Sequence, residues 1–475
     1  MKIKIKELAQ VIGGEVRQGN PALMLKGVGT DSRNISRGRV FFALIGERFD
    51  GHQFVKEAAQ KGAIAAVVKT GFKQKLPGNF GLIQVPDPLF ALGELARCRR
   101  AKLGIKVAAI TGSVGKTTSK EMTALILAKK FKTAKTQGNF NNLIGLPLTI
   151  FEIPERTEVA VLELASNQPG EIARLAEIAQ PDLGVITRIA EAHLEGLENL
   201  EGVEKEKRAL VSALGANGIF IFNLSDPRLS RLAQGFAGRK IGFGLGAKGC
   251  QDAEMTVRAD QIQVFIKGGE PAQRFQLKIS GKKKETGMVE ISGLGEHLVE
   301  NALAAIAVGK ALGISLKECA RALLEFKPIP GRGKLERIRQ GLWMIDDSYN
   351  SNPASVKQAL KVFSEYRRYI PGEKILILGE MKELGKASCQ AHQDLGGFLT
   401  KVDFDQLHYL GGYQKELAAG LGKRLSRKLK IARDLKQLKA RLEREVKDEL
   451  RGGLILIKGS HIIGLWKIAG WLRGR

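Results

Sequence analysis

Residues 110–118 read Ile-Thr-Gly-Ser-Val-Gly-Lys-Thr-Thr, after the apolar segment 106–110 and before a helix-like segment at 116–130. This order predicts a strand, a glycine-rich turn and a helix, in which backbone N–H groups and the helix N-terminus surround a phosphate. Lys116 would reach the β- and γ-phosphates, and the Thr117 hydroxyl would bind Mg²⁺. The stretch therefore predicts a nucleoside triphosphate site. The plainer alternative is an ordinary strand-to-helix turn with a surface lysine.

Length and composition describe a soluble globular protein of several domains. The chain has 475 residues, of which 44% are hydrophobic, and this length suggests about three domains. No window reaches about 18 uncharged apolar residues, so we expect no transmembrane helix, and the basic start does not resemble a signal peptide. The four scattered cysteines (Cys98, Cys250, Cys319 and Cys389) form no Cys-x-x-Cys pair. They predict neither a zinc site nor a disulfide framework, which fits a cytoplasmic location.

The net charge of +27 is large, and it favours anionic partners such as nucleotides, nucleic acid or an anionic membrane face. Much of the excess lies in residues 423–451, where Leu429, Leu435, Leu438 and Leu442 recur at helical spacing. This pattern favours a helix with a solvated charged face. No zinc-finger or RNA-recognition pattern accompanies it, so nucleic acid is not an expected partner.

Strand and helix patterns predict an α/β fold in three domains. We expect a small α/β domain at 1–86, a central P-loop domain with a doubly wound parallel sheet at 87–326, and a Rossmann-like domain at 327–475. Pro86 and Pro88 mark the first boundary, and Pro328-Ile-Pro-Gly331 marks the second. The expected central strands are 107–110, 159–164, 183–186 and 219–223, with helices at 116–130, 170–179 and 301–312. The expected C-terminal strands are 343–346, 374–378, 406–410 and 454–457.

Charged residues follow two of the expected central strands. Glu163 ends the strand Val-Ala-Val-Leu-Glu, and Arg188 and His193 follow the strand at 183–186. Ligands of open α/β sheets bind outside the carboxyl ends of the strands, so these side chains should lie beside the phosphate loop. A carboxylate there would suit Mg²⁺, which takes oxygen ligands. A helix cap or a solvated strand end is the other explanation for Glu163.

Taken together, the motifs resemble the Mur ligase family, the ATP-dependent amide-forming enzymes of peptidoglycan synthesis. The resemblance covers essentially the whole chain. It is nearest to the branch that joins D-alanyl-D-alanine to a UDP-N-acetylmuramoyl-tripeptide. The stretches that carry it are 31–33, 50–52, 111–118, 138–147, Glu163, 192–195, 295–297 with Asn301, 331–332, 346–353, 378–385 with His392, and 458–460.

The resemblance implies a role for each matching position. Lys116, Glu163, His193 and Lys207 would be the catalytic residues, with Lys207 carbamylated by CO₂. Two Mg²⁺ ions would be held by Thr117, Glu163, His193 and the Lys207 carbamate. ATP would contact Gly112, Ser113, Val114, Gly115, Lys116, Thr117 and Thr118, with Asn301 at the adenine, Asp347 at the ribose and Arg332 at the phosphates. The UDP-sugar peptide would contact Ser32, Arg33, Asp50, His52, Asn139, Asn142, Arg188, Asn350 and Asn352.

The implied reaction activates the tripeptide carboxylate as an acyl phosphate, which the amine of D-alanyl-D-alanine then attacks. The resemblance implies a monomer, with peripheral association to an anionic membrane or to cell-wall synthesis proteins left open. Without the resemblance, Lys207 would be assigned as a surface lysine of a charged helix.

Several positions depart from the family pattern: Gln168, Arg188, Ala190, Leu298 and His461. They leave room for a related ligase of altered amino-acid specificity, or for a weakly active paralogue that serves as a binding scaffold. A P-loop ATPase acting on nucleic acid is a remoter alternative.

Overall fold

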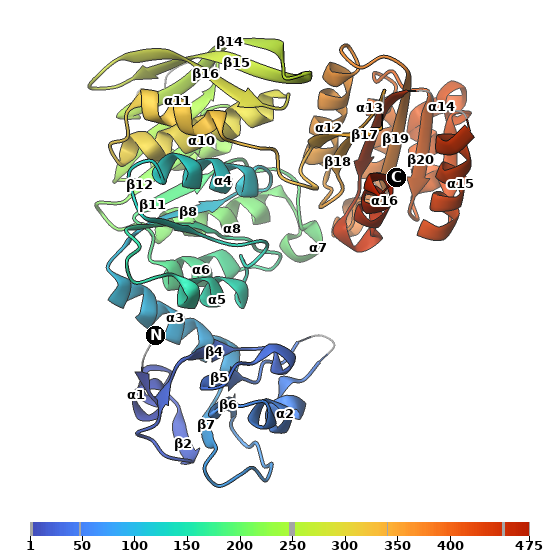
Figure 1. The fold of residues 1–475 in the computed structure, drawn as a ribbon. Coiled ribbons are helices and arrows are strands. Elements are labelled where there is room, and N and C mark those ends of the chain that lie inside the picture. Colours follow the sequence, from blue (N-terminus) through green and yellow to red (C-terminus); the bar gives the residue numbers. More distant parts are fainter. Residues whose placement is uncertain (1–2, 47–48, 247–251, 340, 449–451, 475) are drawn as a thin grey trace.

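The computed structural model describes residues 3–46, 49–246, 252–339, 341–448 and 452–474. Figure 1 shows three α/β units in chain order, a blue N-terminal unit, a cyan-to-yellow central unit and an orange-to-red C-terminal unit. Cys250 and the last three residues of the basic segment 423–451 lie outside the described residues. Among the described helices, none is both long and apolar enough to cross a membrane.

The N-terminal unit is built on a five-stranded sheet of order β2-β7-β6-β5-β4, beside a short antiparallel pair of β1 and β3. The long helix α3 connects this unit to the central unit and packs against both, with Asp87 accepting hydrogen bonds from the first-turn N–H groups and Pro88 at the first helical position. The elements are β1 (Ile3–Lys4), α1 (Ile5–Val11), β2 (Glu15–Gln18), β3 (Met24–Leu25), β4 (Gly27–Gly29), η1 (Ser32–Asn34), β5 (Arg39–Phe42), η2 (Gly51–Phe54), α2 (Val55–Gln60), β6 (Ala65–Lys69), β7 (Gly81–Val85) and α3 (Pro88–Leu103).

The central unit carries a nine-stranded sheet of order β16-β15-β14-β13-β12-β11-β8-β10-β9. The strands of β8 and β10 are buried on both faces, since alternate residues pack against α4 and α10 on one side and α6 and α8 on the other. The elements are β8 (Lys106–Thr111), α4 (Lys116–Leu127), β9 (Thr133–Lys135), α5 (Gly145–Glu152), β10 (Val159–Glu163), α6 (Glu171–Ala179), β11 (Leu183–Ile186), α7 (Leu194–Leu197), α8 (Leu200–Ser212), β12 (Ile219–Asn223), α9 (Pro227–Gln234), β13 (Arg239–Leu245), β14 (Met255–Lys267), β15 (Glu270–Ser280), β16 (Glu285–Ser292), α10 (Glu296–Ala311) and α11 (Leu316–Leu324).

The expected parallel strands of this unit are present, but the sheet is not parallel throughout. From β9 to β14 all pairings are parallel, whereas β14, β15 and β16 pair antiparallel. These three strands form the outer edge of the sheet at the top of Figure 1. The sequence analysis did not predict them.

The C-terminal unit has a six-stranded sheet of order β17-β18-β22-β19-β20-β21, in which only the edge strand β17 is antiparallel. This is the expected Rossmann-like arrangement with one added edge strand. The elements are β17 (Lys334–Arg339), β18 (Leu342–Asp347), α12 (Pro353–Tyr366), β19 (Glu373–Gly379), η3 (Gly385–Ala387), α13 (Ser388–Leu399), β20 (Gln406–Leu410), α14 (Gln414–Ser426), β21 (Leu429–Ala432), α15 (Leu435–Asp448), β22 (Gly453–Lys458), η4 (His461–Ile463) and α16 (Leu465–Arg473).

The basic segment 423–451 is not one helix, so that expectation was wrong. It contains the end of α14, the strand β21 and the helix α15, and Leu429 belongs to the strand. Leu438 and Leu442 are fully buried against the C-terminal core. The helical spacing of the leucines is therefore a coincidence where it extends to Leu429 of β21. Of the four leucines, the three in α15 lie on a helix.

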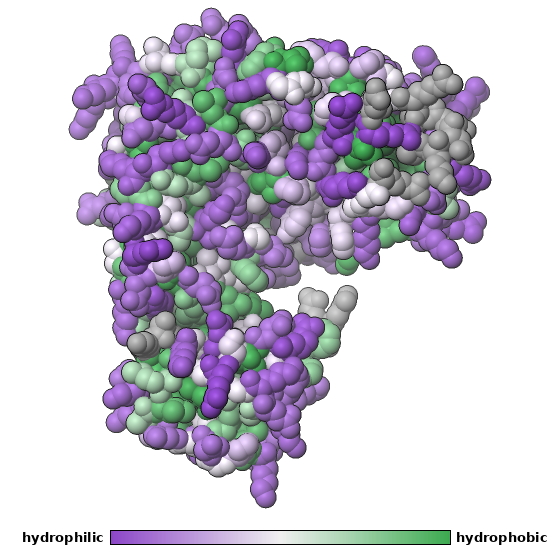
Figure 2. Space-filling view, viewed as in Figure 1, coloured by the Kyte–Doolittle hydropathy of each residue, from purple (hydrophilic) through white to green (hydrophobic). Residues whose placement is uncertain are grey.

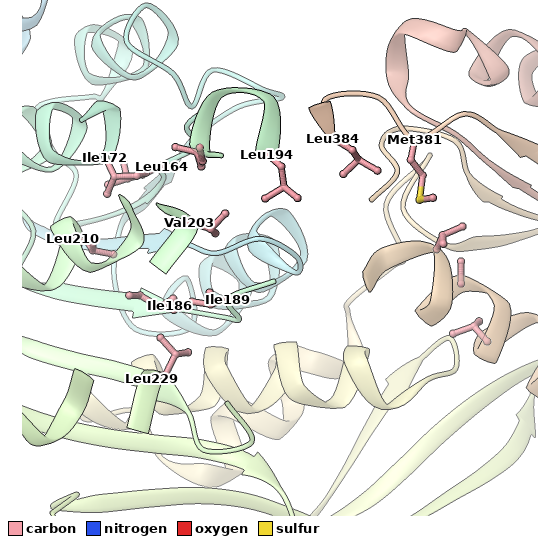
Figure 3. Packing of buried hydrophobic residues seen from close by; sticks show 14 of the residues in the cluster. Leu164, Ile172, Ile186, Ile189, Leu194, Val203, Leu210, Leu229, Met381 and Leu384 are labelled. Atoms are coloured by element: carbon pink, nitrogen blue, oxygen red, sulfur yellow. The ribbon is translucent and has the colours of Figure 1, made fainter. Parts of the chain in front are cut away.

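The central and C-terminal units share one apolar core. A single cluster of buried residues runs from Leu194 and Leu197 of α7 to Met381 and Leu384 of the C-terminal unit. Figure 3 shows Leu194 and Leu384 on either side of this boundary. This shared core brings the carboxyl edges of two sheets to one site.

Candidate active site

Two glycines give the phosphate loop its shape. Gly112 and Gly115 have φ values of 142° and 84°, which side chains rarely adopt. A Cβ on Gly112 would lie 2.1 Å from Thr187 Oγ1, and one on Gly115 would lie 2.4 Å from Asn301 Oδ1. Both positions therefore require glycine, because the loop is pressed against the end of β11 and against α10. The first residues of α4, Lys116 to Thr118, line a cavity. The N–H groups of a first helical turn have no acceptor within the helix, which is what an anion site uses.

Lys116 is folded back over this loop. Its Nζ donates a hydrogen bond to Gly112 O at 2.6 Å. Burial lowers the pKa of Lys116 to about 8, with Glu163 opposing the shift and Arg332 adding to it. A phosphate placed here would restore the cationic form, since an adjacent negative charge favours protonation of an amine.

Glu163 is buried at the end of β10, beside the loop. Its Oε1 accepts hydrogen bonds from Thr117 Oγ1 at 3.2 Å and from Asn141 Nδ2 at 2.8 Å. Its Oε2 is buried and accepts no hydrogen bond from any described residue, although Lys120 Nζ lies 3.7 Å away. A buried carboxylate oxygen without a hydrogen bond, next to a threonine hydroxyl, is a donor set that fits a small divalent cation.

His193 and Lys207 approach the same region from the segment after β11. His193 Nδ1 lies 2.6 Å from Glu383 Oε2, across the boundary between the two units. Lys207 is buried in α8, and its Nζ donates to Ser166 Oγ at 2.7 Å. Burial and the nearby charge of Lys116 together lower the pKa of Lys207 to about 7, with Glu206 and Glu171 opposing the shift. Within the described residues, no three His, Cys, Asp or Glu side chains gather as a metal site. A cation here would thus need the hydroxyl and further oxygen donors.

The C-terminal unit supplies a second group of charges. Arg332 stacks on the Tyr349 ring, with the guanidinium carbon 4.0 Å from the ring centroid. Asp347 Oδ2 lies 2.7 Å from Lys458 Nζ, which also donates to Asn350 O at 2.8 Å. Burial raises the pKa of Asp347, and Lys458 opposes that shift. This ion pair fixes the end of β18 against the end of β22.

Most of these residues line one cavity of about 790 Å³ between the central and C-terminal units, whereas the predicted residues Gly112 and Lys207 are not among its lining residues. This volume suits a nucleotide together with part of a second substrate. The cavity brings together most of the predicted site residues. They are Ser113, Val114, Gly115, Lys116, Thr117, Thr118, Asn139, Asn142, Glu163, His193, Asn301, Arg332, Asp347, Asn350 and Asn352.

The predicted N-terminal residues lie elsewhere. Asp50 accepts hydrogen bonds from His52, whose Nε2 in turn accepts from Lys69 N–H. Ser32 donates to Glu57, and Arg33 is exposed and paired with Asp31. None of the four predicted residues lines the cavity. Figure 2 shows an open space between the N-terminal and C-terminal units, with these units on opposite sides.

Arg188 also lies outside the cavity lining. Its Nη2 is 3.2 Å from Oε1 of Glu300 on α10, and Asn223 Nδ2 donates to the same oxygen. Burial raises the pKa of Glu300, while Arg188 opposes the shift. Arg188, which departs from the family pattern, therefore pairs with the acidic residue Glu300 on the neighbouring helix. A contact between Arg188 and the substrate stays a prediction.

Sequence reasoning missed four residues that complete this site. Lys120 and Glu383 line the cavity, and Ser166 and Glu300 are the partners of Lys207 and Arg188. The signal for Lys120 was available, because it lies one helical turn after Lys116 on the same face of α4. The other three are paired through the fold. Glu383 lies in the stretch 378–385 that carries the family resemblance, but no role was predicted for it, and no local pattern indicates Ser166 or Glu300.

Comparison with known proteins agrees with this geometry. Three family descriptions match the chain: "Mur ligase family, catalytic domain" over residues 24–99, "Mur ligase middle domain" over 110–309, and "Mur ligase, glutamate ligase domain" over 331–461. This chain belongs to the Mur ligase family. Two similar curated relatives are the UDP-N-acetylmuramoyl-tripeptide–D-alanyl-D-alanine ligases of Bacillus subtilis and Escherichia coli. Each is 33% identical, covering 98% of both chains in the first case, and 97% of this chain and 96% of the relative in the second.

Solved structures of the same kind superpose over nearly the full length. A crystal structure of MurF from Acinetobacter baumannii matches with a TM-score of 0.87 and 29% identity, covering 100% of this chain and 99% of that one. MurF ligase from Thermotoga maritima in complex with ADP matches with a TM-score of 0.77 and 25% identity, covering 94% and 97%. The three-unit α/β architecture of this Mur ligase is thus that of the MurF structures.

Proposed function

We propose that this chain is an ATP-dependent ligase that joins D-alanyl-D-alanine to UDP-N-acetylmuramoyl-tripeptide and releases ADP and phosphate. The observation that carries the proposal is the cavity between two units. It combines a phosphate loop, a buried carboxylate with an oxygen free of hydrogen bonds, and cations from the opposite sheet. Full-length similarity to relatives of that name supports the choice of substrates.

The nucleotide would lie along the loop at residues 112–118. The N–H groups of the loop and Lys116 would hold its phosphates, and Arg332 would approach them from the C-terminal unit. Asn301 would contact the adenine and Asp347 the ribose. Both side chains line the cavity, on opposite units, so a bound nucleotide would hold the two units together.

Thr117, Glu163, His193 and a carbamate on Lys207 would hold two Mg²⁺ ions, which supply neutralising charge at the phosphates. The Oε2 atom of Glu163, which accepts no hydrogen bond from a described residue, supports this assignment. Carbamylation needs an uncharged amine, and the low pKa of Lys207 provides one near neutral pH. The carbamate would place a buried negative charge beside Ser166.

The chemistry follows from these charges. An oxygen of the peptide carboxylate attacks the γ-phosphorus, and the bond between that phosphorus and the β–γ bridging oxygen breaks, leaving ADP. Lys116 and Arg332 stabilise the negative charge during this transfer. The dipeptide amine then attacks the acyl carbon, phosphate leaves, and the amine loses a proton as the amide forms. Water must be excluded, since it would hydrolyse the acyl phosphate.

The remaining predicted residues complete the proposal. Ser32, Arg33, Asp50 and His52 would bind the UDP-sugar, so the open space in Figure 2 would narrow around that substrate. The peptide end would meet Asn139, Asn142, Arg188, Asn350 and Asn352. We propose domain boundaries at 86/87 and 326/327, a cytoplasmic monomer, and peripheral contact with an anionic surface as an open possibility.

Phosphate release from ATP tests the proposal, measured with UDP-N-acetylmuramoyl-tripeptide in the presence and absence of D-alanyl-D-alanine. We expect release to require both acceptors and the product to be the pentapeptide by mass spectrometry. Release with a different amine would favour a ligase of altered specificity. Tight ATP binding without release would favour a binding scaffold instead.

A further inference from the structure

Glu383 is a carboxylate of the C-terminal unit that contacts a predicted metal ligand of the central unit. It lies in the loop between β19 and η3, and its Oε2 is 2.6 Å from His193 Nδ1. The His193 side chain is 24% exposed and that of Glu383 is 51% exposed. A contact between side chains this exposed contributes little to stability, so its effect must lie in how it holds the imidazole ring.

The backbones of both partners are fixed. Among the described residues, His193 and Glu383 are two of five non-glycine residues with positive φ, at 55° and 64°. Such conformations persist only where the surroundings enforce them, and they cluster at functional sites. The Glu195 N–H donates to Glu383 O at 3.1 Å, which ties the two strained turns together.

Further contacts hold the Glu383 loop from behind. The Met381 N–H donates to His392 Nε2 at 3.1 Å, and the Lys382 N–H donates to Ser460 Oγ at 2.9 Å. Leu384 is buried in the core shared by the two units, as Figure 3 shows. These contacts fix the position of the loop, and with it the position of Glu383 at the interface between the two units.

The pairing determines which nitrogen of His193 is available. An ionised carboxylate only accepts hydrogen bonds, so Nδ1 carries the proton and donates it to Glu383. Nε2 is then the nitrogen with a free lone pair, on a side chain that lines the cavity. Histidines that bind metals commonly donate their other ring N–H to a carboxylate, which fixes the tautomer and the ring orientation.

We propose that Glu383 is the positioning residue that orients His193 for a divalent cation, so that the metal site is complete only while the C-terminal unit is docked on the central unit. This inference rests on the metal site of the proposed function. It adds that metal affinity and docking are linked, so each strengthens the other by the same factor.

Binding of Mn²⁺ in the presence of ADP tests the inference on the full chain. Electron spin echo spectroscopy detects a histidine nitrogen bound to Mn²⁺. We expect that signal in the wild type, its loss in His193→Ala, and its loss in Glu383→Ala together with at least tenfold weaker Mn²⁺ binding. Glu383→Gln should keep the nitrogen signal, because its amide oxygen can still accept from Nδ1.

Glu195→Gln is the matched control. Its side chain is exposed in the same interface, so it removes an equal charge without touching His193, and it should behave as wild type. A nitrogen signal and affinity that survive Glu383→Ala, while Glu163→Gln abolishes binding, would overturn the positioning role alone. A wild type without the nitrogen signal would overturn the metal ligand set of the proposed function as well.

Discussion

The chemistry of Lys207 gives the sharpest prediction. An ordinary lysine has a pKa of 10.5, whereas burial lowers that of Lys207 to about 7. At pH 8 the uncharged fraction is then about 0.9 instead of about 0.003, a gain of roughly 300-fold. Because only the uncharged amine reacts with CO₂, the structure favours a carbamate at this lysine over the exposed ones.

The perturbation is removal of CO₂ from the assay. Since the pKa is lowered, the uncharged amine is present above pH 7 and is lost as the pH falls below it, to about 0.1 at pH 6. We expect ligase activity to fall at least tenfold in CO₂-free buffer at pH 8, with bicarbonate restoring it. At pH 6 the same recovery should need roughly ten times more dissolved CO₂, in proportion to the uncharged fraction.

Phosphate release measures this activity, and ¹³C-bicarbonate gives the carbamate a resonance of its own. Lys207→Ala should lose both the resonance and the response to bicarbonate. Lys205→Ala is the control, since Lys205 is an exposed lysine of the same helix α8. Full activity without CO₂, in a wild type that shows no carbamate resonance, would refute the reasoning.

Three further changes test the site and the interface. Gly115→Ala should weaken ADP binding at least tenfold, as measured by calorimetry. An alanine at this left-handed φ costs about 1–2 kcal/mol, and its Cβ would clash with Asn301. Unchanged binding would contradict the loop geometry. Lys116→Ala should lower phosphate release by about 10²–10³ with an unchanged melting temperature, and an active variant would remove Lys116 from the reaction. Tyr366→Phe leaves the buried Leu294 N–H without its acceptor, so denaturant titration should show a loss of about 1–3 kcal/mol, and a neutral result would mean that water replaces the hydroxyl.

Four parallel strands of the central unit, β8, β10, β11 and β12, were predictable because they are buried. A strand covered on both faces is a short apolar run. The parallel strands β9 and β13 were not predicted. The strands β14 to β16 were missed because they are long and half-exposed, with charged residues throughout. Their pairing depends on contacts between hairpins and not on a local apolar run.

The residues of the site also divide into those that local sequence predicts and those that it does not. Phosphate loops and strand ends are local, so residues such as Lys116 and Glu163 could be placed from their neighbours in sequence. Glu383 is 190 residues from His193, and Ser166 is 41 residues from Lys207. Both pairs exist only because the chain folds back, and for Glu383 because two units dock. Sequence patterns therefore indicated the ligands and missed the side chains that orient them.

The departure at Arg188 shows how a change that looks functional can be structural. Glu300 is buried enough that its pKa is raised, and Arg188 is the cation beside it. Replacing Arg188 alone would leave that carboxylate with Asn223 as its one partner among the described residues, and a buried carboxylate that has lost its cation is destabilising. A loss of activity in Arg188→Asn would thus mix stability with specificity. Only a variant that also carries Glu300→Ala separates the two, because substrate preference can then change without a buried charge being left unpaired.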